Sequence, residues 1–145
     1  MKENIFGNIV EDGYRCKPAQ VDPERPLKNY KYHLFVCDSP RCHEACQGLA
    51  DKLRNLAEKE NLTTAEHRIK ITRSFCFGSC RFRSAAVIYS NPAFEKSVND
   101  GLWIRNTQDI TDEMWVIIFN KLYKNEPVKE LLTEKFLMPL EDIEH

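Results

Sequence analysis

Tyr32-His-Leu-Phe-Val-Cys37-Asp-Ser-Pro-Arg-Cys42 opens with an apolar run that ends at one cysteine, and a second cysteine follows five positions later. Aromatic and β-branched residues dominate the run, which predicts a buried strand over residues 32–36. Leu49, Leu53 and Leu56 then recur at i, i+4 and i+7 among charged residues. This spacing predicts an amphipathic helix over residues 44–61.

A second strand is predicted over residues 67–73, where Ile69 and Ile71 alternate with polar residues. A strand, a helix and a strand within about 40 residues predict a right-handed β-α-β unit with parallel strands. Parallel strands of one such unit end at the same edge of the sheet. The cysteines after the first strand are therefore expected to meet those after the second.

The remaining elements are two short strands over residues 85–89 and 101–104, expected to pair antiparallel across turn-forming residues, and a helix over residues 107–125. The apolar stripe expected on that helix consists of Ile110, Met114, Ile117, Ile118 and Leu122. The predicted fold class is thus α/β, a mixed sheet of four to five strands with two main helices. We divide the chain into an extended, proline-containing arm (1–31), a domain (32–132) and a tail (133–145).

Composition narrows the classes of function. At 145 residues the chain suits one domain able to fold on its own packing. Lys plus Arg (21) nearly balances Asp plus Glu (22), so the protein has no overall positive charge that would attract nucleic acid. No apolar run reaches the ~20 residues of a membrane span, and the start lacks a signal-like core. We expect a cytoplasmic protein whose six cysteines are thiols or metal ligands, with Cys16 a free thiol.

Four cysteines form two clusters at the predicted strand ends: Cys37 with Cys42, and Cys76 with Cys80. Soft sulfur ligands suit either zinc or an iron–sulfur cluster. Gly78 would let the backbone pass close to a bulky group there. Structural zinc sites commonly use closer pairs in small knuckles that the metal itself folds, so the spacing favours iron–sulfur over zinc. Unrelated buried thiols are the remaining alternative.

The order Cys-x4-Cys, 33 residues, Cys-x3-Cys resembles the thioredoxin-like [2Fe-2S] ferredoxins, a family related to the small iron–sulfur subunit of NADH dehydrogenases. The resemblance continues through the strand at residues 86–89, the Gly-x-Trp strand at residues 101–104, the helix start at residue 107 and the Pro-Val at residues 127–128. It covers roughly residues 32–132 and implies a thioredoxin-like fold.

By this resemblance Cys37, Cys42, Cys76 and Cys80 would hold one [2Fe-2S] cluster, and the protein would be an electron carrier, not an enzyme. The resemblance also implies a homodimer and partners that are redox proteins. An iron–sulfur subunit or accessory module of an NAD-linked oxidoreductase is the first alternative. A zinc-stabilised interaction module is the second.

The chain departs from the family pattern at two places. Cys46 follows Cys42 by four residues, so on one helix both thiols would face the same way and either could be the second ligand. We prefer Cys42, because its distance to the helix leucines better matches the family. Cys46 could instead be a reactive thiol or a half-buried helix residue.

The other departure is a run of cations after Cys80, where the family commonly has a small turn. These cations would raise the potential of a nearby negative cluster or attract a partner with an acidic docking surface. Solvated arginines at a loop edge are the alternative. The residues of this predicted basic patch are Arg41, His43, Arg73, Arg81 and Arg83.

Overall fold

The structure is a computed structural model that describes residues 2–3, 9–10, 28–64, 66–94 and 97–140. Most of the predicted arm, with Cys16, and the last five residues lie outside the described residues. Within the arm, β1 (Lys2–Glu3) pairs antiparallel with β2 (Ile9–Val10). No helix in the described part of the chain is long and apolar enough to cross a membrane.

A four-stranded mixed sheet forms the centre of the fold, in the order β4-β3-β5-β6. β3 is parallel to β4 and antiparallel to β5, which pairs antiparallel with β6. The predicted α/β fold class, the parallel β-α-β unit and the antiparallel pair are confirmed. The strands are β3 (Tyr32–Cys37), β4 (Ile69–Ser74), β5 (Ala86–Ser90) and β6 (Leu102–Ile104).

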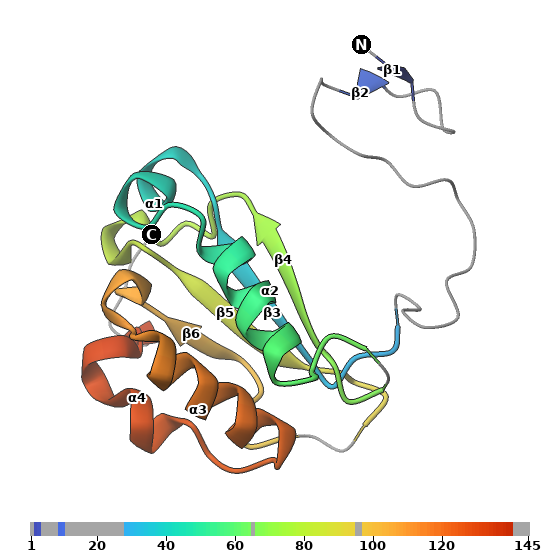
Figure 1. Ribbon diagram of the computed structural model, residues 1–145. Helices are drawn as coiled ribbons and strands as arrows, with labels where there is room; N and C mark the ends of the chain where they lie inside the picture. Colours follow the sequence, from blue (N-terminus) through green and yellow to red (C-terminus); the bar gives the residue numbers. More distant parts are fainter. Residues whose placement is uncertain (1, 4–8, 11–27, 65, 95–96, 141–145) are drawn as a thin grey trace.

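Two long helices, α2 (Leu49–Lys59) and α3 (Asp112–Tyr123), cover one face of the sheet (Figure 1). Burial alternates along β3, so every second side chain enters the core beneath these helices. The helices contact each other, and Lys52 of α2 pairs with Asp112 of α3 at 3.1 Å. The shorter helices are α1 (Pro40–Ala45), η1 (Cys80–Phe82), η2 (Thr107–Asp109) and α4 (Lys129–Phe136).

The predicted helix over residues 44–61 was wrong at its first turn. α1 ends at Ala45, and α2 begins only after Gly48, which has φ of +69°. A left-handed residue cannot continue a right-handed helix, so the chain turns between the two. This break changes the direction of Cys46, which lies in the turn and not on a helix.

The helix predicted over residues 107–125 is split into η2 and α3. Thr111 caps α3, because its side chain accepts a hydrogen bond from the N–H of Met114 at 3.2 Å. Such a cap stabilises a helix by about 1 kcal/mol. The predicted stripe was wrong at Ile117, which is 46% exposed, because Trp115 and Phe119 occupy the core instead.

After α4 the chain returns to its own sheet. Leu137 forms an isolated antiparallel bridge with Ile104 of β6, and the N–H of Met138 donates to the carbonyl of Trp103. Residue 132, where we end the predicted domain, lies inside α4. The segment that follows therefore extends the β6 edge of the sheet towards the cysteines.

Candidate metal centre

The four predicted cysteines lie at one edge of the sheet. Cys37 is the last residue of β3 and stands opposite Ser74, the last residue of the parallel strand β4. The N–H of Asp38 donates to the carbonyl of Ser74 at 2.8 Å, which holds the two chain segments together where they leave the sheet. Cys42 lies in α1, which begins shortly after β3 ends. The loop from Cys76 to Cys80 begins shortly after β4 ends.

Cys37 and Cys42 form a buried pair. Their exposed fractions are 4% and 1%, and Ala85 and Met138 pack beside them. The pKa of the Cys42 thiol is raised to about 11, chiefly by burial and further by hydrogen bonding with Cys37. This thiol therefore stays protonated unless a cation compensates the charge of the thiolate.

Cys76 and Cys80 form a second pair at the surface, with 3.0 Å between their Sγ atoms. The N–H of Gly78 donates to Sγ of Cys76 at 3.2 Å, and Gly78 itself has φ of +80°. The pKa of Cys76 is lowered, first by the hydrogen bond from Cys80 and then by that from Gly78. Cys80 shows the opposite shift, because hydrogen bonding with Cys76 raises its pKa.

Cys80 connects the two pairs. It lies near enough to the buried pair to help raise the pKa of the Cys42 thiol, and Cys37 in turn helps to raise the pKa of Cys80. The buried pair and the surface pair are therefore neighbours across the ends of β3 and β4. The four thiols that the sequence groups together thus lie at one edge of the sheet as two neighbouring pairs.

Cys46 is separate from this group. It is half-buried, and it packs against the main core beneath the helices instead of beside Cys37 and Cys42. Burial raises the pKa of the Cys46 thiol, opposed by the nearby Lys52 and Thr107. The expectation that Cys42 and Cys46 face the same way on one helix was wrong, because α1 ends between them.

Comparison with known proteins gives matches among solved structures alone. No protein-family model matches the chain, and no curated protein matches it. The thioredoxin-like [2Fe-2S] ferredoxin from Aquifex aeolicus is 20% identical with a TM-score of 0.46, over 75% of this chain and 97% of that one. A Cys-to-Ser variant of that ferredoxin is 19% identical with a TM-score of 0.49, over 74% and 97%.

Another structure of a thioredoxin-like [2Fe-2S] ferredoxin from Aquifex aeolicus is 23% identical with a TM-score of 0.46, over 74% of this chain and 90% of that one. All three structures are thioredoxin-like [2Fe-2S] ferredoxins, the family that the sequence resembles.

The thiols can be tested against the two metal groups that the sequence suggests. Among the described residues, no three His, Cys, Asp or Glu side chains are grouped as ligands of a single metal ion. The four cysteines lie instead as two pairs, one from β3 and α1 and one from the loop after β4. A [2Fe-2S] cluster has two irons and four thiolate ligands, so this donor set fits it.

Aromatic side chains pack against the buried thiol pair, a feature that the sequence analysis did not single out. Phe77, Phe82 and Trp103 are partly buried against the buried pair. Phe77 meets Trp103 edge to face, with 6.0 Å between ring centroids. Phe75, in contrast, is 88% exposed directly beside Cys76. The signal in the sequence for this packing is therefore Phe77 alone, which directly follows Cys76.

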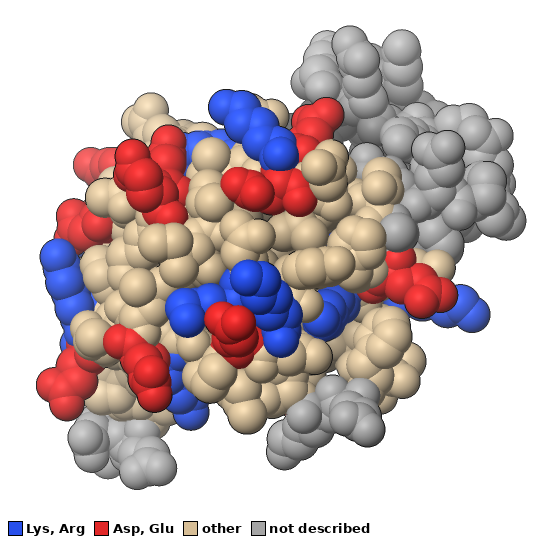
Figure 2. Space-filling model, turned by 60° about the horizontal axis from the view of Figure 1, so that its bottom comes forward, with Lys and Arg blue, Asp and Glu red and all other residues tan. Residues whose placement is uncertain are grey.

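The members of the predicted basic patch differ in their surroundings. Arg73 lies 3.8 Å from a carboxylate oxygen of Asp51, and His43 contacts Asp38 at 2.9 Å. Arg41 lies near enough to the surface pair for its charge to help lower the pKa of Cys76, after the hydrogen bonds from Cys80 and Gly78. Charges of both signs are also interspersed over the face shown in Figure 2, so local placement matters more than overall charge.

Arg83 is attached to the surface pair through the backbone. Its guanidinium donates to the carbonyl of Cys80 at 3.2 Å, and its N–H donates to the same carbonyl. These two bonds hold the turn that leads away from the last thiol. Arg83 thus orders the loop in addition to any effect of its charge.

Proposed function

We propose that this protein is a one-electron carrier that binds one [2Fe-2S] cluster through Cys37, Cys42, Cys76 and Cys80. The observation that carries the proposal is the meeting of a buried thiol pair with a surface thiol pair at the end of two parallel strands. Cys46 packs elsewhere and is left out of the ligand set. When bound, such a cluster takes up and releases single electrons.

The chain's own groups set the charge balance around the sulfurs. Ser39 Oγ lies 3.0 Å from Sγ of Cys37, and the N–H of Gly78 donates to Sγ of Cys76. Hydrogen bonds to sulfur stabilise negative charge, and a reduced cluster is more negative than an oxidised one. These donors should therefore raise the reduction potential. Burial of Cys37 and Cys42 works in the opposite direction.

Electron exchange would take place on the side of Cys76, which is the exposed thiol of the four. Phe75 offers an apolar contact there, and Arg41 and Arg83 offer positive charge. This combination fits a redox protein with an acidic docking surface around an apolar centre. We propose such a protein as the partner.

The resemblance to thioredoxin-like ferredoxins supports two further points. We propose that the protein is a homodimer, which light scattering of the purified protein would test directly. We also propose a cytoplasmic location, because thiolate ligands need a compartment in which cysteines remain reduced.

The deciding experiment is anaerobic purification followed by a visible spectrum and assays of iron and acid-labile sulfide. We expect a brown protein with about two irons and about two sulfides per chain, as a [2Fe-2S] centre requires. Reduction should give the electron paramagnetic resonance signal of a one-electron-reduced cluster. A colourless protein that retains zinc would instead establish a zinc-stabilised module and end the proposal.

The same preparation separates a free carrier from a subunit. Stable co-purification with a flavin-containing protein would assign the chain to an NAD-linked oxidoreductase. Isolation of a brown protein without other chains would assign it as a stand-alone ferredoxin. The cluster proposal holds in both cases.

A further inference from the structure

A cavity of about 430 Å³ lies at the other end of β3 from the cysteines. Tyr32, the first residue of β3, lines the cavity, whereas Cys37 is the last residue of the same strand. Six strand residues span about 17 Å, so the cavity is separate from the proposed cluster site. Its volume falls in the range of small-molecule pockets. The lining includes Lys31, Tyr32, His67, Phe94, Ser97 and Asn125.

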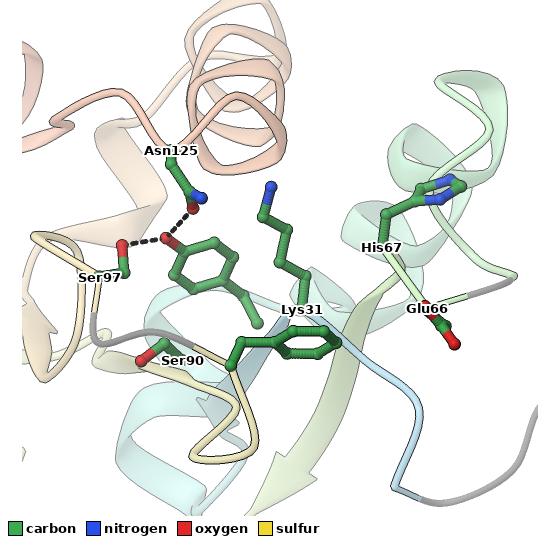
Figure 3. A pocket seen from close by; sticks show the side chains of 8 residues that line it. Lys31, Glu66, His67, Ser90, Ser97 and Asn125 are labelled. Carbon is green, nitrogen blue, oxygen red and sulfur yellow. Dashed lines mark hydrogen bonds between the residues drawn. The ribbon is translucent and has the colours of Figure 1, made fainter.

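Lys31 supplies positive charge inside this cavity. Figure 3 shows its side chain rising through the middle of the cavity, with the ammonium towards Asn125. The ammonium donates to the carbonyl of Tyr123 and lies 5.4 Å from the centroid of that ring. Among the described residues, no carboxylate pairs with Lys31. Since an ammonium has three N–H donors, it can still bind an anion.

A second donor is fixed beside the ammonium. The buried hydroxyl of Tyr32 donates to Oδ1 of Asn125 at 2.9 Å and also contacts the hydroxyl of Ser97 (Figure 3). Because Oδ1 is occupied by this bond, the amide of Asn125 presents its N–H groups as the free donors. Lys31 and Asn125 together can therefore bind the two oxygens of a carboxylate.

Aromatic side chains also line the cavity, among them Phe94 and His67, beside the polar residues Glu66 and Ser90. Phe94 is 47% exposed and offers its ring to a ligand, while the Tyr32 side chain is fully buried. The ring of His67 packs edge to face on Tyr123, with 5.3 Å between centroids. The cavity thus combines an anion-binding end with flat aromatic side chains, which fits a ligand that has both a negatively charged group and an aromatic ring.

The charge balance selects among anions. Lys31 is the ammonium in the lining, and Glu66 contributes a carboxylate that points away from it in Figure 3. One ammonium matches one negative charge, whereas a phosphate dianion would leave excess negative charge near Glu66. A monoanion is therefore the better match.

We propose that this cavity binds a small aromatic carboxylate, with its carboxylate on Lys31 Nζ and Asn125 Nδ2 and its ring against Phe94. The proposal does not depend on the cluster. It adds a small-molecule site to the electron carrier proposed above, at the opposite end of the central strand.

Phenylacetate is a suitable probe, titrated into the full-length protein and followed by amide NMR shifts. We expect saturable shifts around Lys31, Phe94 and Asn125. Because a charge-assisted hydrogen bond is lost, Lys31→Met should weaken binding about tenfold or more. Asn125→Gly should also weaken it, and glycine tolerates the φ of +57° at this position.

Matched controls keep the test specific. Lys124→Met removes an exposed lysine that does not line the cavity and should leave phenylacetate binding unchanged. Benzylamine has the same ring with the opposite charge and should not bind, and inorganic phosphate should bind more weakly than phenylacetate. Absence of saturable phenylacetate binding, equal binding by Lys31→Met, or tighter binding of phosphate would each overturn the proposal.

Discussion

The backbone N–H of Cys46 donates to the carbonyl of Cys42 at 2.9 Å, yet their thiols belong to different parts of the core. Cys42 packs with Cys37, while Cys46 packs beneath the helices near Lys52 and Thr107. The two cysteines are four residues apart and both at least half-buried. They therefore form a natural pair of variants for testing the ligand set.

Cys42→Ser should greatly reduce the cluster content, because a hydroxyl is a poor replacement for a soft thiolate. Cys46→Ser should retain full iron and sulfide and an unchanged visible spectrum. Assays of iron and sulfide on both variants, purified in parallel without oxygen, provide the measurement. Loss of the cluster in Cys46→Ser with retention in Cys42→Ser would reverse the assignment of the second ligand.

Arg41→Gln should lower the reduction potential of the loaded protein. A cation stabilises the more negative, reduced form, so its removal favours oxidation. One exposed charge near the cluster is expected to contribute about 1 kcal/mol, which is about 40 mV for one electron. Redox titration at fixed ionic strength measures the midpoint.

Arg73→Gln is the control for this change, because Arg73 lies near the carboxylate of Asp51. Its effect on the midpoint should be clearly smaller than that of Arg41→Gln. Equal shifts in the two variants would mean that overall charge matters and the placement of Arg41 does not.

The strands and their pairing could be predicted because the alternation of apolar and polar residues along the sequence marks each strand. Ile69 and Ile71 alternate with polar residues, and the strand they predict pairs in parallel with β3 as expected. The position of the four clustered thiols followed from this topology, since each pair comes directly after a strand.

The direction of Cys46 could not be predicted from helical spacing, because Gly48 adopts a left-handed conformation that the spacing does not reveal. The inner face of α3 was also misjudged at Ile117. Trp115 and Phe119 are larger and fill the space between helix and sheet, and tertiary packing of this kind overrides a local apolar stripe. The cavity around Lys31 brings together residues distant in the sequence, so no local pattern marks it.

Gly48→Ala should destabilise the domain by about 1 kcal/mol, because an L-residue is strained at positive φ. No heavy atom lies within 4 Å of the added Cβ, so steric contact does not contribute. Gly48→Asn should cost less, since asparagine adopts this conformation more readily. Urea denaturation of the two variants gives the comparison, and equal costs would argue against backbone strain as the cause.

His33 should make the stability of the domain depend on pH. The pKa of His33 is lowered from 6.5 to about 4, chiefly by burial and further by the charges of Lys70 and Arg68. Its ring stacks on Phe35 at 3.9 Å between centroids and contacts the Thr72 hydroxyl at 2.7 Å. The folded state therefore favours the neutral ring, whereas the unfolded chain binds a proton below pH 6.5.

Because the folded-state pKa lies below the unfolded value, stability is complete above pH 6.5 and falls as the pH drops from 6.5 towards 4. The side chain is only half-buried, so after allowance for solvent screening we expect a loss of about 1 kcal/mol. Urea denaturation at several pH values in this window measures the slope. His33→Gln keeps a polar partner for Thr72 but does not titrate, so it should show a correspondingly flatter profile. An identical slope in this variant would assign the pH dependence to other groups.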